Sequence, residues 1–452
     1  MRQASRDILV LGAGGAGLTA AYRLGAAGHA VTIIEQDSRP GGRTKSGWHA
    51  GRPYNSGTQF LLGDAGPVAD LRNEVSLPVR ELDMAPVAAF IKGRYRVARK
   101  DWLLALKLPL SLRAKVSLAL HMRRFMRKGE LLFKPGWAAA NKIRIMQWDK
   151  MPYSDLLRGV HPDAIPFFEA LAGDFCGSYP HHISALSGLI STVAVSPAFG
   201  RRLVGMEGNE ALHQRLLDGS GAKLLSDCEV VRVRTQTDDV VVTVRRNGGE
   251  EDIRGCYAVC ALPAEVVARV VDGLPDAKRR ALAKVVYRPF LSATFLTEET
   301  GRAPWQDFSV MSVFDKSFNF VVNQTRPFGR DPGSAEAGSA IFAMIVTDQA
   351  QRLLDLSTDE IRAIVRRDML DIFPEMEAVL KDVVIEKWRY GIPGLKPGAL
   401  AEAEARKAPH GRIFFAGDYV TDATANLRSA VASAEEASAL ILSHLQSKML
   451  AQ

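Results

Sequence analysis

Three glycines near the start of the chain could hold the phosphates of a dinucleotide. They are Gly12, Gly14 and Gly17, which follow one apolar stretch and open an amphipathic one. In such a turn the first glycine permits a tight bend, the second lets the backbone approach a pyrophosphate, and the third lets the helix pack closely on the strand. The helix N-terminus then presents free N–H groups and a positive dipole end to the phosphates. Glu35 ends the next apolar stretch and is placed to accept hydrogen bonds from ribose hydroxyls.

The elements that must position these residues form a βαβ unit over residues 6–36, with short apolar strands on either side of the helix. Further strands are predicted later in the chain. Residues 229–234 and 239–245 alternate as a hairpin would, and 257–263 is a buried strand ended by a proline. Residues 411–418 predict a strand followed by a turn. The dinucleotide unit is therefore assembled from distant segments.

The rest of the chain has a different pattern. From about 75 to 205, helices with interleaved basic and apolar residues are expected, with few strand signals. Two β-type stretches, 291–296 and 340–346, precede a helix from Ser357 to about Leu370. The predicted class is α/β (α+β overall), with a Rossmann-type domain interrupted by a substrate domain of mixed sheet and helices. The dinucleotide domain would comprise 1–74, 205–275 and 386–452, and the substrate domain 75–204 and 276–385.

Length and composition bound the class of protein. A chain of 452 residues exceeds what one core usually organises, and 47% hydrophobic with 24% charged residues is ordinary for a globular enzyme. No apolar run is long enough to cross a bilayer, and no signal peptide is expected. The four cysteines have neither a CxxC pair nor metal spacing, so we expect reduced thiols, no metal and a cytoplasmic protein.

The net charge of +8 is concentrated in one segment. Residues 92–128 carry twelve basic side chains and one acidic one. Leucine-rich faces with lysine, arginine and Trp102 suit helices that lie in the interface of an anionic membrane, such as the inner face of the cytoplasmic membrane. The alternative is a helical cap whose leucines face the core and whose charges are solvated. Nucleic-acid binding is not expected, because the chain holds no module for it.

The motifs together resemble the flavin-containing amine oxidase superfamily. The N-terminal fingerprint is followed by Gly41-Gly42-Arg43 and, near the end, by Phe415-Ala-Gly-Asp418. The chain looks most similar to the protoporphyrinogen oxidase and phytoene desaturase branch. The elements that match in order are Asn55–Phe60, Val204–Gly208, Val230, Leu262–Pro263, Tyr287–Pro289, Trp388, Pro393 and the terminal motif.

The resemblance implies FAD as the dinucleotide. Arg43 would supply a charge-assisted contact on the pyrophosphate and flavin side, Val230 would hold the adenine through its backbone, and Asp418 would meet the ribityl or pyrophosphate side. A helix beginning near Ser429 would point its N-terminus at the flavin pyrimidine ring. The expected cofactor-binding residues are Gly12, Gly14, Ala16, Gly17, Glu35, Gln36, Gly41, Gly42, Arg43, Thr58, Gln59, Val230, Gly417, Asp418, Ala430 and Val431.

Two departures from the family pattern bear on the chemistry. Many members have Gly-Ala where this chain has Ser429-Ala430. Amine oxidases of the superfamily often carry a lysine that faces flavin N5, and the matching stretch, 287–295, has none. No cysteine lies between Trp388 and Asp418, so the FAD is expected to be non-covalent. We assign no catalytic side chain; Trp388, Tyr390 and Arg428 are candidates for the flavin face.

The sequence thus predicts an FAD-dependent oxidoreductase that removes two electrons, as a hydride to flavin N5, from an apolar conjugated or cyclic molecule. A porphyrinogen or a carotenoid precursor is the expected substrate, and oxygen or a quinone the expected acceptor. The missing lysine favours this desaturating chemistry. The alternatives are oxidation of a cyclic or secondary amine in a biosynthetic pathway and a non-catalytic flavin-fold binding protein.

Overall fold

The glycine turn lies at the end of the central strand of a parallel sheet. The computed structural model describes residues 7–194, 196, 200–328, 337–420 and 426–450. A Rossmann-type sheet brings together strands from three distant parts of this chain, as the sequence predicts, and all its pairings are parallel. β19 crosses the predicted boundary at 385/386, and the division into two domains stays a prediction. The strand order is β10 (Lys223–Leu225), β2 (Val31–Ile34), β1 (Ile8–Leu11), β14 (Tyr257–Cys260) and β20 (Ile413–Phe415).

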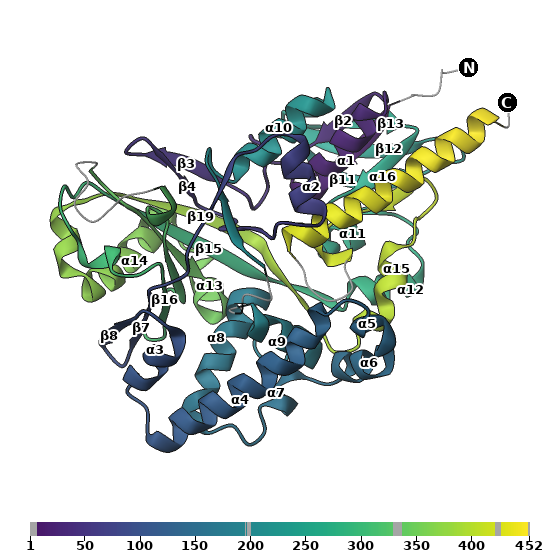
Figure 1. Ribbon diagram of the computed structural model, residues 1–452. Helices are drawn as coiled ribbons and strands as arrows, with labels where there is room; N and C mark the ends of the chain where they lie inside the picture. Colours follow the sequence, from purple (N-terminus) through teal and green to yellow (C-terminus); the bar gives the residue numbers. More distant parts are fainter. Residues whose placement is uncertain (1–6, 195, 197–199, 329–336, 421–425, 451–452) are drawn as a thin grey trace.

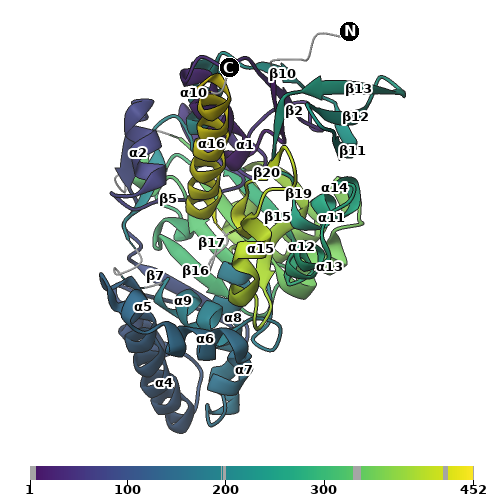
Figure 2. The same ribbon diagram turned by 90° about the vertical axis from the view of Figure 1, so that its right-hand side faces the viewer.

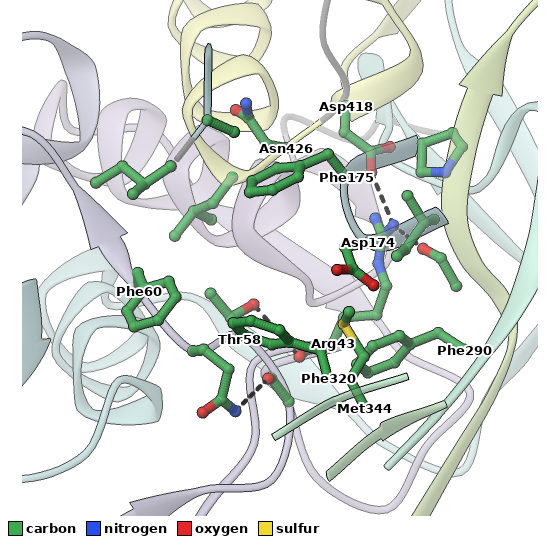
Figure 3. A pocket seen from close by; sticks show the side chains of 18 of the residues that line it. Arg43, Thr58, Phe60, Asp174, Phe175, Phe290, Phe320, Met344, Asp418 and Asn426 are labelled. Carbon is green, nitrogen blue, oxygen red and sulfur yellow. Dashed lines mark hydrogen bonds and ion pairs between the residues drawn. The ribbon is translucent and has the colours of Figure 1, made fainter. Parts of the chain in front are cut away.

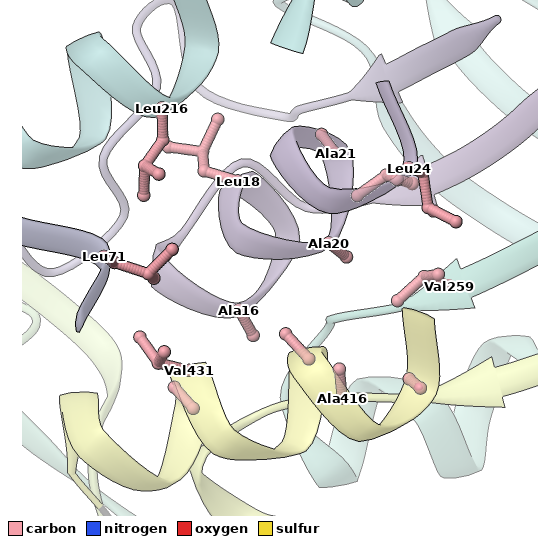
Figure 4. Packing of buried hydrophobic residues seen from close by; sticks show 14 of the residues in the cluster. Ala16, Leu18, Ala20, Ala21, Leu24, Leu71, Leu216, Val259, Ala416 and Val431 are labelled. Carbon is pink, nitrogen blue, oxygen red and sulfur yellow. The ribbon is translucent and has the colours of Figure 1, made fainter. Parts of the chain in front are cut away.

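Helix α1 (Gly15–Ala26) is packed between three other helices, and small residues make this possible (Figure 4). Leu216 of α10, Leu71 of α2 and Val431 of α16 belong to the cluster that surrounds it. A Cβ at Gly17 would lie 1.8 Å from the carbonyl oxygen of Gly12, so only glycine lets α1 approach β1. The neighbouring helices are α2 (Pro67–Glu74), α10 (Glu210–Ser220) and α16 (Leu427–Leu450).

The predicted hairpin is confirmed, and a third strand extends it. β11, β12 and β13 form an antiparallel sheet beside the parallel one. The buried valines of β11 and β12 pack in one apolar cluster with side chains of α11 and α12. The elements here are β11 (Glu229–Thr235), β12 (Val240–Arg246), β13 (Gly249–Gly255), α11 (Ala264–Val270), α12 (Asp276–Leu282) and α15 (Ala403–Lys407).

A seven-stranded mixed sheet forms the middle of the molecule (Figure 1). The two predicted β-type stretches are its strands β15 and β18, and the predicted helix is α14, Thr358–Ile372. Few strands are predicted between 75 and 205, and the strands found there are short; among them β7 pairs with β16, and β8 pairs with β7 and closes one edge. The order is β19 (Leu380–Leu395), β15 (Val285–Thr297), β18 (Ala340–Ile345), β17 (Phe320–Asn323), β16 (Val310–Val313), β7 (Val87–Ile91) and β8 (Arg94–Ala98).

Smaller elements connect the two large sheets. β3 and β4 form a hairpin, and β5, β9 and β6 form a three-stranded antiparallel sheet in that order. No helix in the described residues is long and apolar enough to cross a membrane. These elements are β3 (Ser46–His49), β4 (Arg52–Asn55), β5 (Leu61–Leu62), β6 (Val79–Glu81), β9 (Arg202–Gly205) and α13 (Thr347–Leu353).

The remaining helices form a lobe at the end of the molecule opposite α10 and the last turns of α16 (Figures 1 and 2). The longest, α4, begins at its cap Ser111, whose side chain accepts a hydrogen bond from Ala114 N. Its buried side packs on α9. The lobe contains α3 (Asp101–Lys107), α4 (Leu112–Glu130), α5 (Trp137–Ala140), α6 (Lys142–Lys150), α7 (Tyr153–Leu156), α8 (Ile165–Cys176) and α9 (Ala185–Val193).

Candidate active site

One cavity of about 2000 Å³ extends from the first glycine turn, along the seven-stranded sheet, to the helical lobe. This is about twice the upper size of an ordinary small-molecule pocket. The structure brings most of the predicted residues together around it. Those that line it are Gly12, Gly14, Ala16, Glu35, Gln36, Gly41, Gly42, Arg43, Thr58, Gln59, Val230, Trp388, Tyr390, Gly417, Asp418, Arg428 and Ala430.

Two predicted residues lie outside the cavity lining. Gly17 has the packing role expected of the third glycine, against Gly12. The Val431 side chain is 1% exposed and packs in the core around Ala16. The terminal helix α16 begins at Leu427, in agreement with the predicted start near Ser429, and the Asn426 side chain accepts a hydrogen bond from Ser429 N in its first turn.

The glycine end of the cavity fits an extended dinucleotide. Gly12 has a φ of +98°, which glycine adopts without strain and which makes the tight turn. A Cβ at Gly14 would meet nothing within 4 Å, so the backbone here is open to a ligand. No side chain caps the N-terminus of α1, which leaves its N–H groups available to phosphates. Val230 lies at a β-bulge, where strand pairing is interrupted.

Glu35 links the first two strands to this turn. Its carboxylate accepts hydrogen bonds from Ala13 N at 2.6 Å and from Asp37 N at 2.9 Å, and the residue is buried. Burial raises the pKa of Glu35, and these two N–H donors oppose that effect. A carboxylate held in this way lies on the cavity wall with lone pairs left over, and its predicted contact with a ribose stays a prediction.

Glu35→Gln is expected to weaken FAD binding about tenfold, since a hydrogen bond to a charged group contributes roughly 1.5–3 kcal/mol and the amide retains part of it. The carboxylate accepts one backbone N–H through each of its two oxygens. An amide has only one oxygen, and its NH₂ group does not accept, so one of the two N–H donors loses its partner. Titration of the apoprotein with FAD, followed by quenching of flavin fluorescence, measures the change. Glu250→Gln, on the exposed β12–β13 hairpin, is the matched control and should bind FAD as the wild type does. Equal affinity of Glu35→Gln and wild type would contradict the assignment.

Arg43 and Asp418, far apart in sequence, form an ion pair in the middle of the cavity (Figure 3). Arg43 Nη1 lies 2.7 Å from Asp418 Oδ2, and the same nitrogen donates to the carbonyl oxygen of Gly391. Tyr287 Oη donates to Asp418 Oδ1 at 3.3 Å. Burial and the nearby Asp418 raise the pKa of Tyr287, so this phenol stays protonated. Arg43 is therefore fixed by the terminal motif, which the sequence alone does not reveal.

The candidate flavin-face residues lie close to this pair. Trp388 Nε1 donates to the carbonyl oxygen of Gly42 at 3.3 Å. The Tyr390 ring packs edge-on against Tyr287, with centroids 5.8 Å apart. Arg428 lies beside Gly66, where an added Cβ would be 3.2 Å from Arg428 Nη2. All three line the cavity, and their role toward a flavin stays a prediction.

The wall of the cavity beside the seven-stranded sheet carries apolar side chains. Phe290, Phe320 and Met344 point into it from the seven-stranded sheet, as Figure 3 shows. Strand β15 contributes Tyr287 and Phe290 to the lining and no lysine, as its sequence indicates.

Asp174 is a charged residue of the cavity that sequence reasoning missed. It lies in the last turn of α8, and its carboxylate points into the space bordered by Phe290 and Phe320 (Figure 3). Oδ1 is buried without a hydrogen-bond partner among the described residues. Burial raises the pKa of Asp174 to about 8. A carboxylate near a helix C-terminus is also disfavoured by the helix dipole. The detectable signal was a charged residue within the otherwise apolar run Leu171–Cys176.

Comparisons with known proteins agree with this architecture. An L-amino acid oxidase of Bothrops pictus is 24% identical over 95% of this chain and 88% of its own. An L-amino-acid oxidase of Siganus canaliculatus is 23% identical over 95% and 84%. Among solved structures, putrescine oxidase bound to putrescine superposes with a TM-score of 0.74 at 18% identity, covering 97% of this chain and 99% of its own. Cyclohexylamine oxidase from Brevibacterium oxydans gives 0.75 at 17%, covering 98% and 100%.

These relatives support the superfamily and not specifically its protoporphyrinogen oxidase and phytoene desaturase branch. The family match covers nearly the whole chain, and the fingerprint turn, Glu35 and the terminal motif all border one cavity. Residues 16–442 match the flavin containing amine oxidoreductases, and the chain belongs to this family as an FAD-dependent oxidoreductase.

Proposed function

We propose that this enzyme is an amine oxidase whose substrate joins a cationic amine to a bulky apolar body. One observation carries the proposal: Asp174 Oδ1 is buried with no hydrogen-bond partner among the described residues, and the carboxylate borders the apolar side chains Phe290 and Phe320 in the cavity (Figure 3). A buried carboxylate without a partner destabilises the protein, and an ammonium group would supply its missing charge and donors. Neutral hydrocarbons would leave it unpaired.

The related proteins support an amine as the oxidised group. Their names specify putrescine, cyclohexylamine and L-amino acids. Of these, cyclohexylamine combines one amine with an apolar ring, which matches one carboxylate among phenylalanines. We propose oxygen as the acceptor, because these relatives are oxidases.

The chain's own residues would orient the substrate and keep water out. Asp174 would hold the ammonium group, and Phe290 and Phe320 would pack on the apolar body. Placing the reacting carbon in a dry, fixed position supplies much of the rate acceleration. Bound FAD supplies the two-electron acceptor. The neutral amine that reacts forms when its proton passes to the Asp174 carboxylate.

An assay of products in air tests this function. With cyclohexylamine and longer apolar monoamines, we expect oxygen uptake, hydrogen peroxide and a carbonyl product in equal amounts. Putrescine and polar L-amino acids should react more slowly, because their second charged group would lie against the apolar side chains Phe290 and Phe320. Turnover of L-amino acids ahead of every apolar monoamine would contradict the proposed substrate class.

A second candidate function is oxidation of a neutral conjugated molecule such as a porphyrinogen or carotenoid precursor. Two observations favour it: the cavity is large enough for such a substrate beside FAD, and β15 lacks a lysine. It leaves Asp174 without a role, so we rank it second.

A further inference from the structure

We propose that helices α3 and α4 form a docking surface for an anionic lipid bilayer, and that the cavity opens beside it. We call this the basic apolar surface; its apolar residues are Trp102, Leu106, Leu112, Val116 and Leu120. Ten large apolar side chains are exposed in the described residues, and half of them are these five. Leu112 is 78% exposed and Leu120 63% exposed, which is far beyond incidental exposure.

Helix α4 has two apolar faces, and only one has a partner. Ala114, Leu118 and Phe125 are buried, and this side of the helix packs on α9. Leu112, Val116 and Leu120 follow one another at intervals of four, so they form a stripe on the outer face. Lys115 Nζ donates to the carbonyl oxygen of Leu106 at 2.6 Å, which places the end of α3 beside the start of this stripe.

The cations on α4 lack acidic partners. None of them forms an ion pair with a residue that the structure describes, whereas arginines on the β11–β13 sheet are paired at 2.6–3.0 Å. Burial lowers the pKa of Lys128, and the neighbouring cations Arg124 and Arg144 lower it further. The α4 cations are Arg113, Lys115, Arg123, Arg124, Arg127 and Lys128.

The cavity reaches this surface. Trp102, Leu106 and Arg123 are exposed and also line the cavity, so its mouth lies between α3 and α4. Both helices belong to the lobe remote from α10 in the two ribbon views, where a flat bilayer can approach without meeting the Rossmann-type sheet (Figures 1 and 2). An apolar substrate dissolved in the bilayer would then enter without crossing water.

The basic apolar surface carries both cations and exposed apolar side chains, and this combination favours an anionic bilayer as its partner. Cations alone would suit any polyanion, but a nucleic acid or an acidic protein tail offers nothing to the leucine stripe. An anionic bilayer offers phosphates to the cations and acyl chains to Leu112, Val116 and Leu120. Both kinds of residue thus find a partner only at a lipid surface.

Sedimentation of the holoenzyme with lipid vesicles tests the proposal. We expect binding to phosphatidylcholine vesicles that contain about one third phosphatidylglycerol, much weaker binding to pure phosphatidylcholine, and loss at high salt. Replacing Lys107, Arg113, Arg124 and Lys128 by glutamine should lower the partition coefficient about tenfold or more. These four residues do not line the cavity. The matched control replaces Arg232, Arg234, Arg245 and Arg254 by glutamine, an equal change in charge on the β11–β13 sheet, and should bind nearly as the wild type does.

A second variant separates a bilayer from other polyanions. Leu112→Asn, Val116→Asn and Leu120→Asn together should lower vesicle binding about tenfold and leave retention on a heparin column unchanged. The flavin spectrum and the melting temperature verify that each variant is folded. Failure of the wild type to bind anionic vesicles would overturn the proposal. Wild-type vesicle binding by the asparagine variant would overturn it too, in favour of a polyanion.

Discussion

Gly17→Ala is expected to abolish the accumulation of folded, flavin-bound enzyme. The added Cβ would lie 1.8 Å from Gly12 O and 3.2 Å from Val10 Cγ1, so α1 would have to move away from β1. The obstacle is backbone, which cannot rotate aside as a side chain can. Overpacking at such a site costs about 3 kcal/mol or more, a large part of a domain's stability. The shift would also displace the N-terminus of α1 from the phosphates.

Two glycine variants provide the controls for this prediction. A Cβ at Gly301 meets nothing within 4 Å and requires no unusual φ, so Gly301→Ala should leave soluble yield, melting temperature and flavin content unchanged. A Cβ at Gly14 projects into open space on the cavity wall, so Gly14→Ala should fold normally and lose affinity for FAD. Recovery of Gly17→Ala as a yellow protein of wild-type stability would refute the packing argument.

Asp174→Asn is expected to lower kcat/KM for an apolar amine about 100-fold. Removing one partner of a desolvated charge pair costs roughly 3 kcal/mol, or about two powers of ten in rate. The substitution preserves the shape of the cavity, so oxidation of a neutral substrate should change little. Steady-state oxygen uptake with an amine and with a neutral analogue measures the contrast. An equal loss with both substrates would assign Asp174 a structural role only.

The pH dependence of KM and of the melting temperature also distinguishes a substrate-binding role of Asp174 from a purely structural one. Because burial raises the pKa of Asp174 to about 8, the free carboxyl is protonated below that pH, and KM for the ammonium form should fall as pH rises through 8. Because the folded state binds the Asp174 proton more tightly than the unfolded state does, the free energy of unfolding is highest below the unfolded pKa near 4. It falls as the pH rises from there through 8, where the folded protein also loses the proton. Asp174→Asn should therefore raise the melting temperature most at pH 8–9 and least near pH 4. A uniform change across pH would contradict the assigned pKa.

Much of the fold could be predicted from local sequence. The tight turn at Gly12, the close approach at Gly17 and the alternating residues of the β11–β12 hairpin each depend on a few neighbouring residues, and all three predictions are confirmed. Strands β7 and β8 were missed because they are five residues each, and because β7, with which β8 pairs, finds its other partner in β16, more than 200 residues later.

Site residues that belong to a sequence motif were predicted. Those that only the folded chain brings to the cavity were missed. Glu35 follows from its spacing to the glycines. The ion pair of Arg43 with Asp418 joins two motifs that each looked like an independent cofactor contact. Asp174 belongs to no motif, and its importance comes from the aromatic residues that distant strands place around it. From the sequence alone, a single aspartate in a helix is expected to face solvent. Only the packing of α8 in the folded protein shows that Asp174 lines the cavity.

Anaerobic mixing of the oxidised enzyme with substrates tests the central claim most directly. We expect cyclohexylamine or a longer apolar monoamine to bleach the flavin absorbance near 450 nm, and the alcohol or hydrocarbon of the same shape to leave it unchanged. The bleaching should be about 100-fold slower in Asp174→Asn. Bleaching by a porphyrinogen or carotenoid precursor, with no response to any amine, would contradict the amine oxidase account and support the second candidate.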